Sequence, residues 1–257
     1  VDYWTILNTL NQQVQQVDPQ ATLISNDRIH PGADGNFIMA YQFLKTTNAP
    51  QYVSNTEIEH GTLSRSEFCT ITDLITTSNS ASFRYKAQSL PFPVTNDIDK
   101  ALSLTSFQNE LNTERLKVTG LAPGKYGLEI GGKFIAGFTG SELAEGINLA
   151  LLKNTPQYLQ ALAVKEKTDT HRDLQVKLRD IKLIEINYLA KSLWTDFVAA
   201  AAYINDLKNR NVQPYVSQKN RFDAYLINKP NEVGLEQELA NLTDEIYTIN
   251  QPVEYTI

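Results

Sequence analysis

Apolar residues at the start of the chain recur at intervals of three and four positions, which is typical of an amphipathic helix. The stripe consists of Trp4, Leu7, Leu10, Val14 and Val17. Pro19 disfavours helical geometry at the residue before it, so we expect the helix to end at Asp18. The apolar run 21–24 then predicts a short buried strand, and a second helix is expected over residues 35–45. The order helix, strand, loop and helix is that of a layered α/β fold.

The pattern changes near residue 48, where short segments that alternate apolar and polar residues begin, as half-buried strands do. The clearest of these segments are 82–87, 116–119, 126–130 and 134–138. Between the last two stand Gly131 and Gly132, which supply the positive φ angles of a tight hairpin turn. We therefore predict a small β-rich module over residues 48–138. This module is either a lid-like or carbohydrate-binding accessory or a packing module that covers the flank of a neighbouring domain.

A helical periodicity returns at residue 139 and continues to the end of the chain. Thr139 and Glu142 have the spacing of a capping box, and Pro156 suits the first turn of a second helix. Long apolar stripes lie within residues 159–197 and 235–246. We predict a helical region over residues 139–257 that ends in an extended tail. Antiparallel packing of helices within the chain would bury these stripes, and so would contacts with a second copy of the chain.

Composition narrows the function classes. A length of 257 residues fits one or two domains. The net charge of −6 argues against a nucleic-acid surface built from clustered lysine and arginine. The single cysteine, Cys69, excludes an internal disulfide framework and a zinc site made of four cysteines. No apolar run approaches the ~18 residues of a transmembrane helix.

The three histidines occupy unrelated contexts, and no two of them have metal-binding spacing. His60 has acidic neighbours, but alternation along a strand would place Glu59 on the opposite face. His171 lies in a polar stretch and is expected at the surface. The chain also has no glycine-rich phosphate loop and no dinucleotide fingerprint. We therefore expect neither a metal site nor a cofactor.

Asp27 and His30 lie in the loop expected at the carboxyl end of the first predicted strand. In open α/β sheets, functional groups concentrate just beyond the carboxyl ends of the strands. A structural interpretation is open as well, because Asp27 could simply accept hydrogen bonds from backbone N–H groups at a helix start.

Residues 27–32 read Asp-Arg-Ile-His-Pro-Gly and precede the second predicted helix. This segment resembles the last conserved block, Asp-x-x-His-Pro, of the SGNH (GDSL-type) hydrolase family. The resemblance implies that residues 1–47 are the C-terminal end of a flavodoxin-like α/β hydrolase sheet. It also implies that His30 is the general base for a serine nucleophile and that Asp27 orients His30. A serine hydroxyl needs such a base at neutral pH, and the carboxylate fixes the histidine tautomer.

The other motifs of that family do not occur in this sequence. Neither Gly-Asp-Ser, which carries the nucleophile, nor Gly-x-Asn-Asp, which contributes to the oxyanion hole, is present. In the family both precede Asp-x-x-His, and Asp27 lies too close to Val1 to leave room for them. We therefore expect a C-terminal part of an SGNH-type esterase, lipase or acylhydrolase. By itself it would be inactive, because an N-terminal fragment would carry the nucleophile.

The resemblance further implies a small ester or an acylated carbohydrate as substrate, no cofactor, and export of the parent protein to the periplasm or beyond. Two other functions stay open. The β-rich module would bind a glycan if exposed aromatic residues such as Tyr126 and Phe134 lined one groove. The helical region would serve as an interaction or assembly arm, including in an oligomer.

Overall fold

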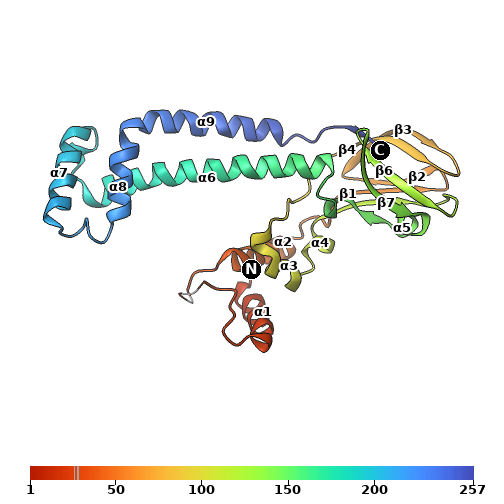
Figure 1. Cartoon of the computed structure of the whole chain (residues 1–257), viewed down its shortest axis with the longest axis horizontal. Coiled ribbons are helices and arrows are strands. Elements are labelled where there is room, and N and C mark those ends of the chain that lie inside the picture. The colour runs from red at the N-terminus through yellow and green to blue at the C-terminus, as the bar shows by residue number, and fades with distance from the viewer. Residues whose placement is uncertain (26, 28) are drawn as a thin grey trace. The chain divides into compact units, whose positions relative to one another are not determined.

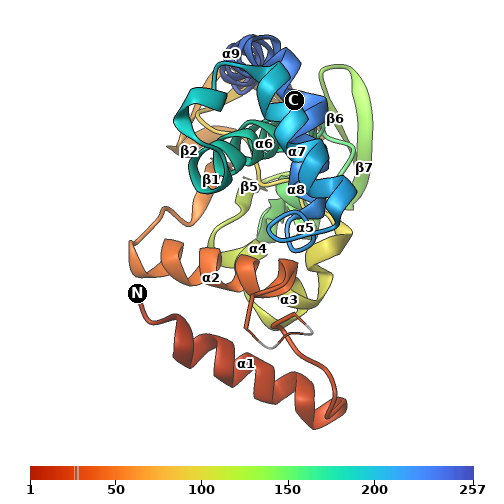
Figure 2. The same ribbon diagram turned by 90° about the vertical axis from the view of Figure 1, so that its left-hand side faces the viewer.

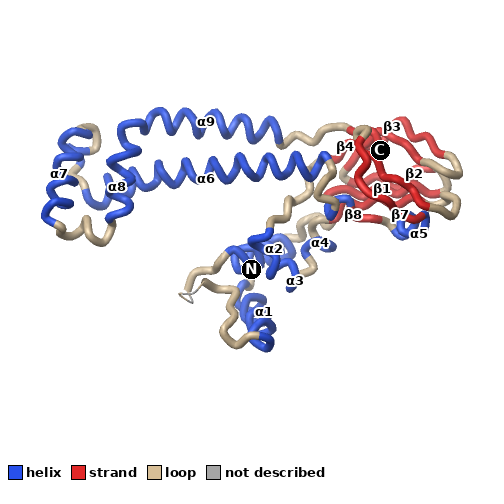
Figure 3. The backbone as a smooth tube through the Cα atoms, viewed as in Figure 1, coloured by secondary structure: helices blue, strands red, loops and turns tan. Residues whose placement is uncertain are grey.

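The computed structural model describes residues 1–25, 27 and 29–257, and the chain divides into two compact units. The first unit consists of Val1–Leu162 and Asn250–Ile257, and the second of Ala163–Ile249. The chain has a mixed α/β architecture with a sheet that contains a parallel strand pair, small antiparallel sheets and C-terminal helices (Figures 1 and 3). Each unit has a hydrophobic core of its own.

Helices α1 (Tyr3–Val17) and α2 (Ala33–Thr46) open the first unit and lie side by side (Figure 2). The side chain of Asp2 caps α1, and the helix ends directly before Asp18, as predicted. A small core between the helices contains the buried side chains of Leu10, Leu23, Ile38 and Ala101. Trp4 and Val17, at the two ends of the predicted stripe, are exposed.

The prediction of a strand over residues 21–24 is wrong, because this segment forms only a single β-bridge, between Ile24 and Pro31. The expected burial is nevertheless present, since Leu23 is 2% exposed. Side chains of α1 satisfy backbone groups that a neighbouring strand would otherwise bind. The Leu23 N–H donates to Oδ1 of Asn11 at 3.0 Å, and Gln15 donates to the Ala21 carbonyl at 3.2 Å. The apolar segment 21–24 is therefore a loop whose backbone is bound by polar side chains of α1.

The strands of the first unit form two sheets and a hairpin. The first sheet has the order β2-β1-β5-β8, with β1 (Tyr52–Glu59), β2 (Thr62–Glu67), β5 (Thr113–Val118) and β8 (Ile147–Asn148), and β1 and β5 are parallel. The second is antiparallel with the order β3-β4-β9, from β3 (Cys69–Thr76), β4 (Ala81–Ala87) and β9 (Tyr255–Thr256). Strands β6 (Lys125–Ile130) and β7 (Lys133–Thr139) make the hairpin. Their inward residues, such as Ile58, Phe83, Leu116 and Ile130, share one core.

This grouping differs from the division predicted at residues 47 and 138. Helices α3 (Asp99–Leu104) and α4 (Phe107–Glu110) lie inside the predicted β-rich module, and α3 packs against α2. Strands β8 and β9 come from the predicted helical region 139–257 but pair with the sheets. Helices and strands this short carry too few residues for a periodic pattern, so long-range contacts decide where they belong.

Three local signals of the sequence are confirmed. Gly131 and Gly132 have φ angles of +59° and +75° and form the turn of the β6–β7 hairpin. Thr139 and Glu142 make both reciprocal hydrogen bonds of a capping box at the start of α5 (Gly140–Glu145). Pro156 is the first residue of α6 (Pro156–Tyr188), which begins in the first unit and continues into the second.

The second unit is helical. Besides α6 it contains α7 (Phe197–Arg210), α8 (Lys219–Asn228) and α9 (Glu232–Ile249). Lys167 pairs with Glu245 and Lys182 with Glu232, at 2.5 and 2.6 Å, so α9 runs antiparallel to α6. His171 is partly buried there, with its Nε2 atom 3.1 Å from the Thr243 hydroxyl. Apolar residues of the predicted stripes, from Leu174 to Phe197 and from Leu235 to Leu242, pack in the core of this unit. No helix in the described part of the chain has the length and apolar character needed to span a membrane.

Candidate functional site

Asp27 and His30 form a hydrogen-bonded pair in the loop before α2. Nδ1 of His30 lies 2.7 Å from Oδ2 of Asp27. The other carboxylate oxygen, Oδ1, accepts hydrogen bonds from the N–H groups of Ile29 and His30 and from the hydroxyl of Ser25, at 2.7 to 3.0 Å. Asp27 therefore binds backbone donors and the imidazole at the same time. Asn26 and Arg28, its neighbours in the sequence, lie outside the described residues.

The loop is fixed at both ends. The Ser25 N–H donates to the His30 carbonyl at 2.8 Å, next to the bridge between Ile24 and Pro31. At the start of α2, Gly35 allows close approach, because a Cβ atom there would lie 2.5 Å from the Leu23 carbonyl oxygen. The side chain of Asn36 donates to the Pro31 carbonyl at 3.1 Å. The position of His30 is therefore set by backbone contacts and by the first turn of a helix.

The electrostatics of the pair suit proton transfer. The hydrogen bond from the His30 ring, together with backbone donors, holds the pKa of the Asp27 carboxyl well below its usual range. An ionised carboxylate at Nδ1 favours the tautomer that carries its proton there, which leaves the lone pair on Nε2. The His30 side chain is 78% exposed, and within the described part of the chain no group hydrogen-bonds to Nε2. This nitrogen is free to accept a proton from an incoming group.

No nucleophile faces His30 within the described residues. The hydroxyl of Ser25 points to Oδ1 of Asp27, at 2.7 Å, and so lies on the carboxylate rather than on the imidazole. No serine, threonine or cysteine side chain that the structure describes is hydrogen-bonded to the His30 ring. The described residues thus place a carboxylate on the imidazole and no hydroxyl or thiol beside it.

The other histidines are separate from this pair. His60 has a φ angle of +47° in the turn between β1 and β2, so the strand alternation assumed for it does not apply. Its N–H group donates to the Thr119 carbonyl at 3.3 Å. Across residues 1–25, 27 and 29–257, no cluster of three or more histidine, cysteine, aspartate or glutamate side chains could hold a metal ion.

A buried polar cluster in the first unit was missed at the sequence level. The Tyr85 hydroxyl donates to Oε1 of Glu114 at 2.7 Å, Gln157 donates to the same oxygen at 3.2 Å, and Ser54 lies 2.6 Å from the Tyr85 hydroxyl. Burial raises the pKa of Glu114 to about 7. A signal existed, because Leu116 and Val118 point inward and a period of two places Glu114 on the same face.

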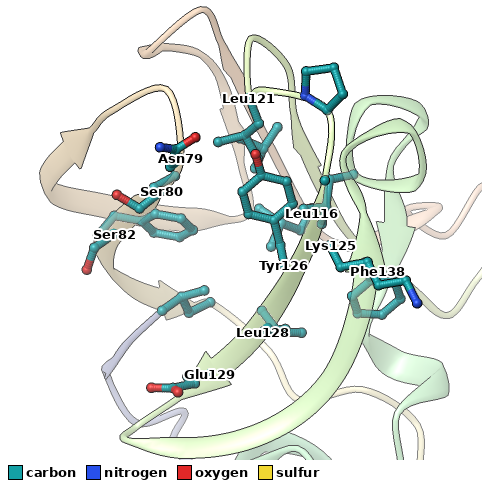
Figure 4. A pocket seen from close by; sticks show the side chains of 18 residues that line it. Asn79, Ser80, Ser82, Leu116, Leu121, Lys125, Tyr126, Leu128, Glu129 and Phe138 are labelled. Carbon is teal, nitrogen blue, oxygen red and sulfur yellow. The ribbon is translucent and has the colours of Figure 1, made fainter.

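A cavity of about 590 Å³ opens between β4 and β6 in the first unit (Figure 4). The buried side chains of Leu116, Val118 and Leu128 line it, together with the half-buried Phe138. Tyr126 lines it too, with its hydroxyl donating to the Ala122 carbonyl at 2.6 Å. Phe134 pairs with Glu129 across the hairpin and lies over Gly127, on the face opposite to Tyr126. The two aromatic residues considered for glycan binding therefore do not line one groove.

Comparison with known proteins gives one match. No protein-family model matches the chain, and no curated protein does. A solved structure described as BT4096, a gut microbial diltiazem-metabolizing enzyme, matches all of this chain with a TM-score of 0.82 and 32% sequence identity. The chain spans 60% of the length of that structure's chain. Its architecture is thus similar to part of an enzyme that metabolises a drug.

Proposed function

We propose that this chain supplies the acid–base half of a serine ester hydrolase of the SGNH type. In this proposal His30 is the general base and Asp27 is its orienting carboxylate. The observation that carries the proposal is the 2.7 Å hydrogen bond between Nδ1 of His30 and Oδ2 of Asp27, with Nε2 left open. The serine and the oxyanion hole would lie on a polypeptide segment outside residues 1–257, since Gly-Asp-Ser and Gly-x-Asn-Asp are missing from this sequence.

The proposed reaction has an acylation step and a deacylation step. Nε2 of His30 accepts the serine proton while the serine oxygen forms a bond to the ester carbonyl carbon. Asp27 stabilises the imidazolium, which then gives its proton to the leaving alcohol as the ester C–O bond breaks. Water, deprotonated by the same nitrogen, then attacks the acyl carbon, and the imidazolium returns the proton to the serine oxygen as its bond to that carbon breaks and the acid leaves. Exposure of the ring lets both the serine and the substrate approach Nε2 from outside this chain.

The structural neighbour supports a hydrolase. Diltiazem is an ester drug, so an enzyme that metabolises it is compatible with ester cleavage, although the neighbour is longer than this chain. We infer a small ester or an acylated carbohydrate as the substrate class. Glycan binding by the β-rich part is less well supported, because Tyr126 and Phe134 lie on opposite faces of the hairpin.

The test is hydrolysis of p-nitrophenyl acetate by the full-length natural protein. Exchange of His30 for alanine should lower kcat by at least about 10³-fold, because serine loses its base. Matched controls are His60→Ala and His171→Ala, which remove histidines from the turn after β1 and from α6. These controls should leave kcat within about twofold. Full activity in the His30→Ala protein would rule out this role for the pair.

A further inference from the structure

The polar cluster around Glu114 lies inside the first unit and takes no part in the hydrolysis proposed above. Glu114 is on β5, Tyr85 on β4 and Ser54 on β1, and Gln157 lies in the first turn of α6. All four side chains are buried. A buried polar atom without a hydrogen bond destabilises the fold, so the donors and acceptors of such a cluster should balance.

The donors and acceptors do not balance when Glu114 is ionised. Its Oε1 atom accepts hydrogen bonds from the Tyr85 hydroxyl at 2.7 Å and from Nε2 of Gln157 at 3.2 Å. Because the Tyr85 proton points to Glu114, the Ser54 hydroxyl is the donor in its 2.6 Å contact with Tyr85. Among the described residues, Oε2 of Glu114 and Oε1 of Gln157 have no hydrogen-bond partner. The two acceptors in excess thus belong to one pair of side chains.

One proton on Oε2 of Glu114 would satisfy both of these oxygens. A protonated carboxyl group donates through one oxygen and accepts through the other, and a primary amide donates through nitrogen and accepts through oxygen. The two groups can therefore share two hydrogen bonds. The bond from Nε2 of Gln157 to Oε1 of Glu114 is already present. The second bond would run from the protonated Oε2 to Oε1 of Gln157.

The surroundings of Glu114 favour this proton. Burial raises the pKa of its carboxyl to about 7, although hydrogen bonds from Tyr85 and Gln157 act in the opposite direction. Burial also raises the pKa of Tyr85 well above its ordinary value, so this phenol stays neutral, and Cys69 of β3 is a further titratable group that acts on it. The polar groups bonded to Glu114 directly or through Tyr85 are uncharged: Ser54 of β1, Tyr85 of β4, Asn148 of β8 and Gln157 of α6.

The Glu114–Gln157 pair joins the first turn of α6 to the sheet. Tyr158, the next residue, is buried too, and its hydroxyl donates to the Val94 carbonyl at 2.8 Å. Two side-chain hydrogen bonds thus hold this turn, but of their acceptors only Glu114 titrates. When Oε2 releases its proton to solvent, two unpartnered acceptors remain in a buried site and only the bond from Nε2 of Gln157 is left. Ionisation therefore weakens one of the two anchors.

We propose that Glu114 and Gln157 form a proton-dependent clasp, in which the protonated acid and the amide share two hydrogen bonds and loss of the proton loosens the first turn of α6 from β5. The clasp is closed at acidic pH and opens as pH rises through about 7. It is separate from the Asp27–His30 pair and does not depend on the proposed hydrolysis.

The test is hydrogen exchange of the full chain at about pH 5.5 and about pH 8.5, with protection factors corrected for the intrinsic exchange rate at each pH. The amides of residues 158–162 should lose about tenfold or more of their protection at the higher pH. The Glu114→Gln side chain makes the same two bonds to Gln157 and cannot ionise, so protection there should stay high at both pH values. Gln157→Leu removes the amide, and protection should be low at both.

Exchange of β5 separates the clasp from the overall stability of the unit. Glu114 still titrates in Gln157→Leu, so the amides of β5 should keep their dependence on pH while those of residues 158–162 lose it. The matched control is Gln160→Leu, because this glutamine of the same helix donates to a backbone carbonyl, that of Gln251, at 2.7 Å. This control should keep the pH dependence of both segments.

Two results would overturn the clasp. One is protection of residues 158–162 that is equal at the two pH values in the unmodified chain. The other is a dependence on pH that persists in these residues in Gln157→Leu, since ionisation of Glu114 would then act without the amide. Should Gln157→Leu fail to fold, Glu114→Gln decides, because an unchanged pH dependence of residues 158–162 in that variant rules the clasp out.

Discussion

Ser25 and His30 bind the same carboxylate through different oxygens. The Ser25 hydroxyl donates to Oδ1 of Asp27, and the His30 ring bonds to Oδ2, both at 2.7 Å. Asp27 is thus the centre of the loop and holds a backbone turn, a hydroxyl and an imidazole at once. If the pair is catalytic, Asp27 has two separable duties, one for the fold of the loop and one for the tautomer of His30.

Exchange of Asp27 for asparagine should separate these duties. The amide oxygen can still accept from the loop, but a neutral side chain no longer fixes the His30 tautomer or stabilises the imidazolium. We expect kcat for p-nitrophenyl acetate in the full-length protein to fall by about 10²- to 10⁴-fold, with KM nearly unchanged. Ser25→Ala leaves the Asp27–His30 pair in place and should lower kcat by less than about tenfold. Equal losses in the two variants would indicate that Asp27 only shapes the loop.

Gly35 should be essential for the position of this loop. A Cβ atom there would lie 2.5 Å from the Leu23 carbonyl oxygen and 3.0 Å from Cβ of Pro31, so Gly35→Ala must push α2 away from the loop. We expect the first unit to lose about 1–3 kcal/mol of stability, measured by urea unfolding, with a lower kcat in the full-length protein.

The matched control is Gly32→Ala, at the N-cap of the same helix. A Cβ atom at Gly32 meets nothing within 4 Å, and its φ angle is −73°, which alanine adopts freely. This variant should lower the free energy of unfolding by only about 0.5 kcal/mol. A Gly35→Ala protein as stable and as active as the Gly32→Ala protein would show that α2 can shift without effect on His30.

The elements that the sequence predicted correctly depend on residues close together in the chain. The turn at Gly131 and Gly132, the capping box of Thr139 and the start of α6 at Pro156 each need only a few neighbours. The Asp27–His30 hydrogen bond belongs to the same class, because its partners are only three positions apart in the sequence. Its suggested role came from a family resemblance rather than from this geometry.

Features that were missed depend on contacts between distant residues. The pairing of β9 with β4 joins Tyr255 to Tyr85, which no local pattern encodes. Residues 21–24 have the apolar character of a strand, but Asn11 and Gln15 satisfy their backbone instead. Glu114 was overlooked because a charged residue is expected at the surface, although alternation with Leu116 placed it inside.

The buried Glu114 should make the first unit less stable as pH rises. The folded-state pKa is raised to about 7, above the ordinary value of 4.5, so the folded state binds the proton more tightly than the unfolded state. The resulting stabilisation is complete below pH 4.5 and is lost as pH rises through about 7. We expect a loss of about 3 kcal/mol between pH 4.5 and pH 8, measured by amide exchange of β5.

Glu114→Gln should abolish most of this pH dependence, because the amide keeps an oxygen for the Tyr85 hydroxyl and cannot ionise. Glu129→Gln, at an exposed position of β6, serves as the control and should leave the slope unchanged. A Glu114→Gln protein that retains the wild-type slope would mean that another group of the first unit titrates in this range.

The second unit contains a cluster of ion pairs, and we expect its buried lysine to contribute far more to stability than its exposed lysine. Lys229 is 12% exposed and pairs with Glu185 and Glu232, which are 3% and 14% exposed. Lys182 reaches the same two glutamates but is 52% exposed. Removal of a buried lysine leaves the carboxylates without a compensating charge in a region of low dielectric, whereas water largely takes the place of an exposed lysine.

Lys229→Met should therefore destabilise the unit by about 3 kcal/mol, and Lys182→Met by about 1 kcal/mol or less. Urea unfolding followed by the fluorescence of Trp194, which lies in this unit, measures both values. Similar losses of stability for the two lysines would show that solvent screens the whole cluster and that burial of Lys229 does not increase its contribution to the free energy of unfolding.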